Sequence, residues 1–244
     1  MHLALVIPVY NEAERLREEL LDSLFEELAH VQVIFVDDGS TDATKDKLLQ
    51  YESKKNNKNI KIISLQKNSG KAEAVRQGFN QVEKDCLFVA FTDGDFATPP
   101  KEMARILKSA FELNCDALLG VRNDKGNGRI ETVRYRKFQG LIFNFFVKNI
   151  LGLDLKDPQC GMKVFKNSEI LKKITERPFL NPWLIDLEMI LRWVQLDPRV
   201  SIVEVDLLNW KHQSKSKVKI KDPILMLKDL LRMRKEYLTG DAKE

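Results

Sequence analysis

The chain has little of what holds small secreted or zinc-stapled proteins together. It has only three cysteines, Cys86, Cys115 and Cys160, and their wide spacing fits neither a zinc site nor a disulfide framework. Cys86 and Cys115 lie in apolar runs, which predicts buried thiols and suits a reducing compartment. We also expect no signal peptide, because an apolar strand pattern begins at Leu3 without the basic and apolar regions of a leader.

Other absences exclude further classes of protein. The longest apolar patch, within residues 141–147, is far too short to span a membrane. A net charge of only +4 gives no argument for nucleic-acid binding. No Gly-x-Gly-x-x-Gly follows the first apolar run, which argues against a nicotinamide-binding domain. No repeat or linker divides the 244 residues, and 43% hydrophobic content is typical of one globular domain, 1–244.

What the chain does contain is an alternation of short apolar runs and helical patterns. The predicted strands are residues 3–7, 33–36, 60–65, 86–91, 116–119 and 201–205. In the first half, Asn11 is the predicted cap of a helix through Leu28, and Ser40 or Thr41 caps the next. Helices are also expected at 71–82, 103–113 (begun by Pro99 and Pro100), 134–151, 183–194 and 222–238. This pattern predicts an α/β fold with a mostly parallel central sheet flanked by helices.

Polar clusters follow three of the predicted strands. Residues 8–12 (Pro-Val-Tyr-Asn-Glu) follow the first, residues 37–42 (Asp-Asp-Gly-Ser-Thr-Asp) the second, and Asp93-Gly94-Asp95 the fourth. Ligands of such sheets bind at the carboxyl ends of the strands, so the three clusters predict one site. Asp93 and Asp95 are suited to hold Mg²⁺ or Mn²⁺ there. The alternative for this pair is a solvated turn.

Together with later motifs, these clusters make the chain resemble the inverting GT-A-fold nucleotide-sugar glycosyltransferases of glycosyltransferase family 2. Within that family the polyprenyl-phosphate sugar transferases are the most similar, with the dolichyl-phosphate glucosyl branch first and the mannosyl branch next. The narrower motifs are Asp-Pro-Gln-Cys-Gly-Met-Lys-Val-Phe at 157–165, Asp-Leu-Glu at 186–188, and Asn-Trp at 209–210 leading to Ser-Lys at 216–217. The resemblance implies a Rossmann-like GT-A sheet with amphipathic C-terminal helices.

The chain departs from these relatives at several points. Ala97 stands where mannosyl relatives have a Gln ligand, and Lys215 stands where glucosyl relatives have Gly. We expect no counterpart here to the membrane anchor at the start of the eukaryotic glucosyl enzymes. These differences bear on the sugar and the lipid. The reaction class stays the same.

The resemblance implies a role for each cluster. Residues 1–122 would bind the nucleotide sugar, with Asp38 accepting from the base and Asp95 holding the metal. The implied donor-binding residues are Pro8, Tyr10, Glu12, Asp37, Asp38, Lys71, Asp93, Gln159 and Lys217. UDP-glucose is the preferred donor and GDP-mannose the next. For Asp37 and its neighbours the alternative is an Asx turn, and for Lys71 a solvated lysine.

Residues 123–244 would bind the acceptor, a polyprenyl phosphate. Arg122, Arg134 and Lys217 are the implied phosphate-binding residues, and Arg134 is counted as catalytic with Asp95, Asp186 and Glu188. A lipid phosphate is already anionic at neutral pH, so it needs no strong base. Asp186 and Glu188 would then contact a sugar hydroxyl or position an arginine. In the alternative reaction, transfer to a hydroxyl of a glycan or lipid core, one of them is the base; for Glu188 a plain helix-face role is also open.

The basic and apolar helices 134–151 and 222–238 are suited to lie on a membrane surface. The alternative is that their apolar faces pack on the domain or on a partner subunit. The expected location is the cytoplasmic face of a membrane, peripherally bound, either as a homo-oligomer or with a membrane-anchor partner.

Overall fold

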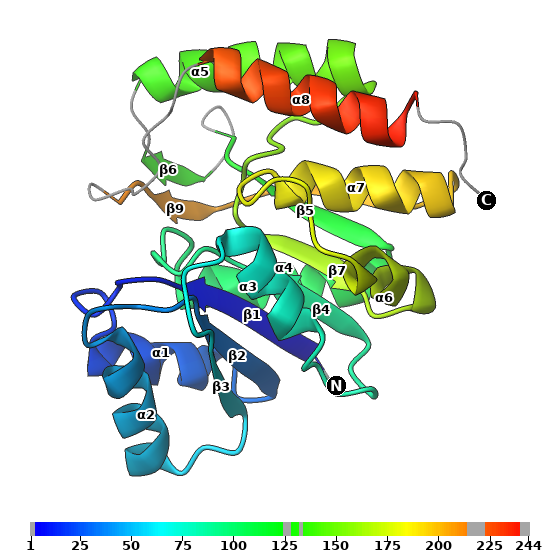
Figure 1. Cartoon of the computed structure of the whole chain (residues 1–244). Coiled ribbons are helices and arrows are strands. Elements are labelled where there is room, and N and C mark those ends of the chain that lie inside the picture. Colours follow the sequence, from blue (N-terminus) through cyan, green and yellow to red (C-terminus); the bar gives the residue numbers. More distant parts are fainter. Residues whose placement is uncertain (1–2, 124–127, 132–133, 214–222, 240–244) are drawn as a thin grey trace.

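The computed structural model describes residues 3–123, 128–131, 134–213 and 223–239. Its centre is a seven-stranded sheet in the order β3-β2-β1-β4-β7-β5-β8 (Figure 1). These strands are β1 Leu3–Val9, β2 Val31–Asp37, β3 Ile60–Ser64, β4 Phe88–Phe91, β5 Ala117–Val121, β7 Lys163–Lys166 and β8 Ile202–Asp206. All neighbours pair in parallel except β7, which runs antiparallel to both β4 and β5. The predicted mostly parallel sheet is therefore confirmed.

Helices cover both faces of this sheet. On one face, Leu5, Val33 and Phe88 pack with α1 Glu18–Glu27, α2 Thr44–Lys55 and α4 Pro100–Leu113. On the other face, Val6, Val36 and Phe91 pack with α3 Lys71–Phe79, α6 Glu169–Glu176 and α7 Ile185–Leu196. Successive strand residues point to opposite faces, so the continuous apolar runs of the sequence supply both layers.

A further layer lies outside α7. Here α5 Arg134–Phe146, the π-helical turn η1 Val147–Leu151 and α8 Pro223–Tyr237 lie on the side of α7 away from the sheet (Figure 1), and α8 contacts both η1 and α7. Phe143, Leu187 and Leu230 belong to the apolar cluster that joins them. A small parallel ribbon, β6 Arg129–Glu131 with β9 Asn209–Lys211, completes the second half. In the described part of the chain, no helix combines the length and apolarity needed to cross a bilayer.

Two predicted helix caps are wrong. Helix α1 begins at Glu18 with Arg17 as its N-cap, so Asn11 does not cap it. Helix α2 begins at Thr44, and its first N–H donates to the Asp42 carboxylate rather than to Ser40 or Thr41. Pro100 does begin α4, as predicted. The capping prediction failed because the side chains of Asn11 and Ser40 bond across loops instead, as described next.

Candidate active site

The loops after β1 and β2 are bonded to each other at the carboxyl edge of the sheet. The backbone N–H of Asn11 donates to Ser40 Oγ (2.9 Å), and the N–H of Thr41 donates back to Asn11 Oδ1 (2.8 Å). The next N–H, of Glu12, donates to Thr44 Oγ1 (2.8 Å). Asn11 has a positive φ of 50°, which asparagine tolerates better than most residues. These contacts fix two of the three predicted clusters as one surface.

Asp38 holds a third loop against this surface. Its two carboxylate oxygens accept from the N–H groups of Ser69 (2.7 Å) and Gly70 (2.8 Å). Burial raises the pKa of Asp38, and the two N–H donors oppose that rise. Its neighbour Asp37 accepts from the N–H of Ser40 (3.1 Å), the Asx turn weighed above. Asp38 therefore positions the start of α3, and its contact with a nucleotide base stays a prediction.

Asp93 forms an ion pair with Lys71, the first residue of α3. Lys71 Nζ lies 2.7 Å from Asp93 Oδ1 and 5.2 Å from the centre of the Phe91 ring. Burial opposes ionisation of Asp93, but Lys71, followed by Arg122 and Lys163, lowers its pKa below the ordinary value. Burial lowers the pKa of Lys71, but the Asp93 carboxylate and then Asp186 raise it by more, so the pKa of Lys71 lies above its ordinary value. Lys71 is thus no solvated lysine, since its side chain is 16% exposed.

Two glycines, Gly94 and Gly161, let the backbone lie close to the carboxylates of Asp93 and Asp95. A Cβ on Gly161 would lie 1.9 Å from Asp93 Oδ2, and a Cβ on Gly94 would lie 2.3 Å from the carbonyl oxygen of Pro8. Gly161 belongs to the narrow motif at 157–165, so that motif forms the wall beside Asp93. Gly94 allows the Asp93–Asp95 turn to pack closely against the end of β1.

Asp95 lies in an environment with surplus negative charge. Burial, and then the nearby Asp93 carboxylate, raises its pKa to about 6, and Glu12 adds to that rise. Its Oδ1 accepts from the N–H of Ala97 (3.0 Å). A hard divalent cation between two such carboxylates relieves their repulsion, so the residues fit Mg²⁺ or Mn²⁺. Within the described residues, no group of three or more His, Cys, Asp or Glu is arranged to hold a metal, so ligand oxygens would complete its coordination.

Asp186 and Lys163 extend the site to α7 and β7. Lys163 is fully buried, and its Nζ donates to the carbonyl of Cys160 and lies 3.9 Å from Asp186 Oδ1. Among the described residues Asp186 Oδ1 has no hydrogen-bond partner. Burial raises the pKa of Asp186, while Lys71 and Lys163 oppose the rise and Asp93 adds to it. Asp186 therefore faces the same cations as Asp93. Sequence reasoning missed Lys163; a lysine in the otherwise apolar stretch 162–165 was its signal.

Glu188, predicted as catalytic together with Asp186, lies in a different environment. It is fully buried and accepts from the N–H of Leu180 (2.8 Å), the hydroxyl of Tyr237 (2.5 Å) and the guanidinium of Arg192 (2.7 Å). Arg192 in turn donates to the carbonyls of residues 174, 177 and 178. The Glu188 carboxylate is therefore part of a buried hydrogen-bond network between α7 and α8. The catalytic prediction for Glu188 finds no support here, whereas the expectation that it positions an arginine fits.

The remaining predicted residues are distributed as follows. Arg122 pairs in bidentate fashion with Asp157, with Nε and Nη2 each 2.7 Å from a carboxylate oxygen, and lies over the Trp210 ring. Gln159 is exposed in the turn after Asp157. Pro8 and Glu12 are buried, and Tyr10 is half-buried in the first loop. Arg134 is the first residue of α5, and its role stays a prediction. Lys217 lies outside the described residues.

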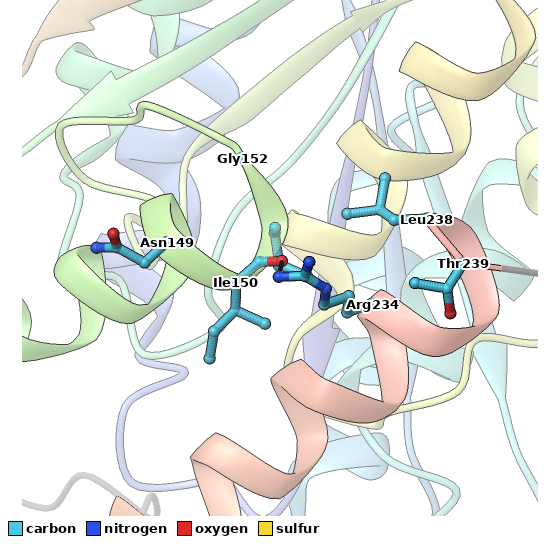
Figure 2. A pocket seen from close by; sticks show the side chains of 7 residues that line it. Asn149, Ile150, Gly152, Arg234, Leu238 and Thr239 are labelled. Carbon is cyan, nitrogen blue, oxygen red and sulfur yellow. Dashed lines mark hydrogen bonds between the residues drawn. The ribbon is translucent and has the colours of Figure 1, made fainter.

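A separate pocket of about 260 Å³ lies between η1 and the end of α8 (Figure 2). Its lining residues are Asn149, Ile150, Leu151, Gly152, Arg234, Leu238 and Thr239. Arg234 Nη1 donates across it to the carbonyl of Ile150 (3.2 Å). None of the predicted site residues that the structure describes lines it, so the candidate site remains the sheet edge.

Comparison with known proteins gives consistent matches. The model of Glycosyl transferase family 2 matches residues 4–177. Dolichyl-phosphate beta-glucosyltransferase from Saccharomyces cerevisiae is 29% identical over 265 residues, covering 98% of this chain and 75% of the yeast protein. The protein of the same name from Dictyostelium discoideum is 30% identical over 259 residues, covering 98% of this chain and 76% of the relative.

A solved structure shares the fold. Glucosyl-3-phosphoglycerate synthase from Mycobacterium tuberculosis, in complex with Mn²⁺, uridine diphosphate and phosphoglyceric acid, superposes with a TM-score of 0.69. The two are 16% identical, and the superposition covers 99% of this chain and 80% of the other. At this identity the likeness concerns the fold, and it confirms the predicted GT-A architecture.

Proposed function

The chain belongs to glycosyl transferase family 2 and is a glycosyltransferase, and we propose that it transfers glucose from UDP-glucose to a polyprenyl phosphate. The observation that carries the proposal is the convergence of Asp93 and Asp95 with Lys71, Lys163 and Asp186 at the carboxyl edge of the sheet. The relatives that match nearly the whole chain are named for transfer of glucose to dolichyl phosphate, which supports glucose as the sugar and this acceptor class.

The site suits a diphosphate leaving group. Mg²⁺ or Mn²⁺ held by Asp93 and Asp95 would act as a Lewis acid on that diphosphate. Lys71 lies 2.7 Å from Asp93 Oδ1, so with Asp93 as a metal ligand the ammonium of Lys71 would be available to the donor. Burial lowers the pKa of Lys71, but Asp93, Asp186 and Asp95 raise it by more, so Lys71 is charged in the working pH range. Asp37, Asp38 and Tyr10 would line the nucleoside end, and Gln159 would approach the sugar.

The acceptor phosphate needs no strong base, because its second pKa is near 6 and it is anionic at neutral pH. Asp186 then serves to orient Lys71 and Lys163 or a sugar hydroxyl. Arg134 and Lys217 remain the proposed phosphate ligands. Arg122 could bind phosphate only if its guanidinium turned away from Asp157. Attack from the face opposite the diphosphate inverts the anomeric carbon, as the family resemblance implies.

Transfer to a hydroxyl acceptor is the second candidate, and one observation favours it. Asp186 Oδ1 has no hydrogen-bond partner among the described residues, and burial raises the pKa of this carboxyl, as suits a general base. Two neighbouring cations nonetheless oppose that rise, which makes Asp186 a weaker base. We therefore rank the phosphate acceptor first.

A lipid acceptor requires contact with a membrane, and the outer layer suits it in part. Leu230, Met233 and Phe143 are packed inward against α7, so one side of these helices belongs to the protein core. On the outer side Leu141 and Phe145 of α5 are 68% and 63% exposed. We propose peripheral binding to the cytoplasmic face of a membrane through this outer side, supported by a homo-oligomer or by an anchor partner.

The test is nucleotide release by the purified protein. UDP-glucose and GDP-mannose are offered with and without polyprenyl phosphate, in Mg²⁺, Mn²⁺ or EDTA. We expect release of UDP that requires both the lipid phosphate and the metal. Release that requires a hydroxyl acceptor instead would favour the second candidate, and failure to bind any nucleotide sugar would refute both.

A further inference from the structure

We propose that Trp183 contacts the phosphate-proximal part of the polyprenyl chain and thereby selects a lipid acceptor. This inference rests on the proposed function. The Trp183 side chain is 53% exposed, and an indole combines a large apolar body with a polar N–H, which suits contact with a ligand that is part apolar and part charged.

The backbone of the segment that carries Trp183 is fixed by hydrogen bonds and packing. Asn181 Oδ1 accepts from the N–H groups of Trp183 (2.7 Å) and Leu184 (3.0 Å). Pro182 is pressed against Gly70, where an added Cβ would lie 2.6 Å from the proline Cβ. A fixed backbone lowers the entropy lost when the indole binds a ligand.

This segment is bracketed by two parts of the candidate site. The carbonyl of Pro182 accepts from the N–H of Ala72 (3.0 Å), the residue after Lys71, which pairs with Asp93. In the other direction Asp186, which faces Lys163, lies three residues along the chain. Trp183 is therefore held beside the residues that are proposed to bind the donor and neutralise phosphate.

The next residue connects the segment to the apolar outer layer. Leu184 is 8% exposed and packs in the cluster that contains Phe143 of α5 and Leu230 of α8. The exposed Leu141 and Phe145 belong to the same helix as Phe143. The backbone at Trp183 thus links residues of the cationic site to the apolar outer layer. A polyprenyl phosphate has this same order of parts, an anionic head followed by an apolar chain, and an indole suits the boundary between them.

Binding can be measured from fluorescence, because the chain's three tryptophans differ in exposure. Trp193 is 2% exposed and Trp210 is 9% exposed, so iodide should quench mainly Trp183. We expect polyprenyl phosphate to protect wild-type fluorescence from iodide and Trp183→Phe to abolish the quenchable component. Quenching unchanged by a polyprenyl phosphate that the protein demonstrably glycosylates would overturn the inference. So would equal protection by phosphatidylcholine vesicles without the acceptor, which would make Trp183 a membrane anchor instead.

Kinetics supply the second measurement. Trp183→Ala should raise the KM for a long polyprenyl phosphate by about tenfold while the KM for the nucleotide sugar stays within about twofold. Trp183→Phe should keep part of the affinity. Leu87→Ala is the matched control, because Leu87 is 51% exposed but precedes β4, at the opposite end from Asp93. If wild type does not transfer sugar to polyprenyl phosphate, the proposed function fails with the inference. If wild type does and Trp183→Ala behaves like Leu87→Ala, only the inference fails.

Discussion

Lys71 and Asp93 form an ion pair, with Nζ 2.7 Å from Oδ1, at the point where α3 begins and β4 has just ended. The pair joins the predicted metal-binding turn to the loop that Asp38 holds through Ser69 and Gly70. If Asp93 held a metal, Lys71 would be placed to pair with the diphosphate of the donor instead.

Replacing Lys71 should therefore impair donor use more than stability. We expect Lys71→Met to lower kcat/KM for the nucleotide sugar by about a hundredfold, since a charged contact to the leaving group is lost. Nucleotide release and the melting temperature are the measurements. Lys54→Met is the matched control, because Lys54 also pairs with a carboxylate, Glu18, but is 62% exposed. Equal activity of the two variants would contradict the role given to Lys71.

Metal binding should weaken as the pH falls toward the pKa of Asp95. That pKa is raised to about 6 by burial and by Asp93, and only the ionised carboxylate binds a cation. The affinity for Mn²⁺ should therefore fall by about tenfold for each pH unit below about 6 and level off above about 7. Electron paramagnetic resonance of free Mn²⁺ measures this directly. Asp95→Asn should remove most of the affinity, and an affinity independent of pH over this range would refute the assignment.

The raised pKa of Asp95 also has a consequence for stability. The folded protein binds a proton here at a pH where the unfolded chain, with a pKa near 3.8, has released it. This group therefore stabilises the fold below about pH 4, and its contribution is lost as the pH rises through about 6. In metal-free protein, Asp95→Asn should flatten the dependence of the free energy of unfolding on pH across that window. Urea titrations at several pH values measure it, and an unchanged slope would contradict the shift.

Much of the fold was predictable because parallel strands are buried on both faces and appear as apolar runs. Six strands of the seven-stranded sheet were predicted in this way. The seventh, β7, was not, because Lys163 and Lys166 bracket its only two apolar residues. Its antiparallel insertion between β4 and β5 depends on packing and has no local signal. Asn11 was misread for a similar reason, since its amide bonds to a loop far away in sequence.

The site residues on α7 show the limit of spacing arguments. Asp186 and Glu188 are two residues apart, about 200° around a helix, so they face different sides. Asp186 faces the cations of the site, and Glu188 faces Tyr237 of α8. The sequence spacing would distinguish the roles of the two carboxylates only if one side of α7 faced solvent. Residues 185–193 are all buried, so it does not. The tertiary contacts of each side decide which carboxylate is near the chemistry.

This division can be tested by conservative variants of the two carboxylates. Asp186→Asn should lower kcat by about tenfold if the acceptor is a phosphate, and by about a thousandfold or more if Asp186 is the base for a hydroxyl acceptor. In the second case the acidic limb of the pH–rate profile should also disappear. The measurements are kcat and its pH profile with each acceptor class. A loss of a thousandfold with the phosphate acceptor would contradict the mechanism proposed here.

Glu188→Gln should instead act on stability. It leaves the buried Arg192 without its anionic partner, which costs about 3–5 kcal/mol of the free energy of unfolding. Glu169→Gln is the matched control: it also breaks a pair with a cation, Lys172, but on the surface, and should cost less than about 1 kcal/mol. Urea unfolding separates the two. A Glu188→Gln variant that is stable but inactive would support the prediction that Glu188 is catalytic.

Gly161→Ala should inactivate the protein through Asp93 while leaving the fold intact. The added Cβ would lie 1.9 Å from Asp93 Oδ2, so the carboxylate must move from its place beside Lys71. Gly140→Ala makes the same chemical change in α5, where a Cβ meets nothing within 4 Å, and it should raise stability by up to about 1 kcal/mol. We expect Gly161→Ala to lose Mn²⁺ affinity and nucleotide release together, and Gly140→Ala to keep both. Because Gly161 belongs to the motif at 157–165 rather than to the carboxylate turn, retained metal binding in Gly161→Ala would show that the motif does not shape the metal site.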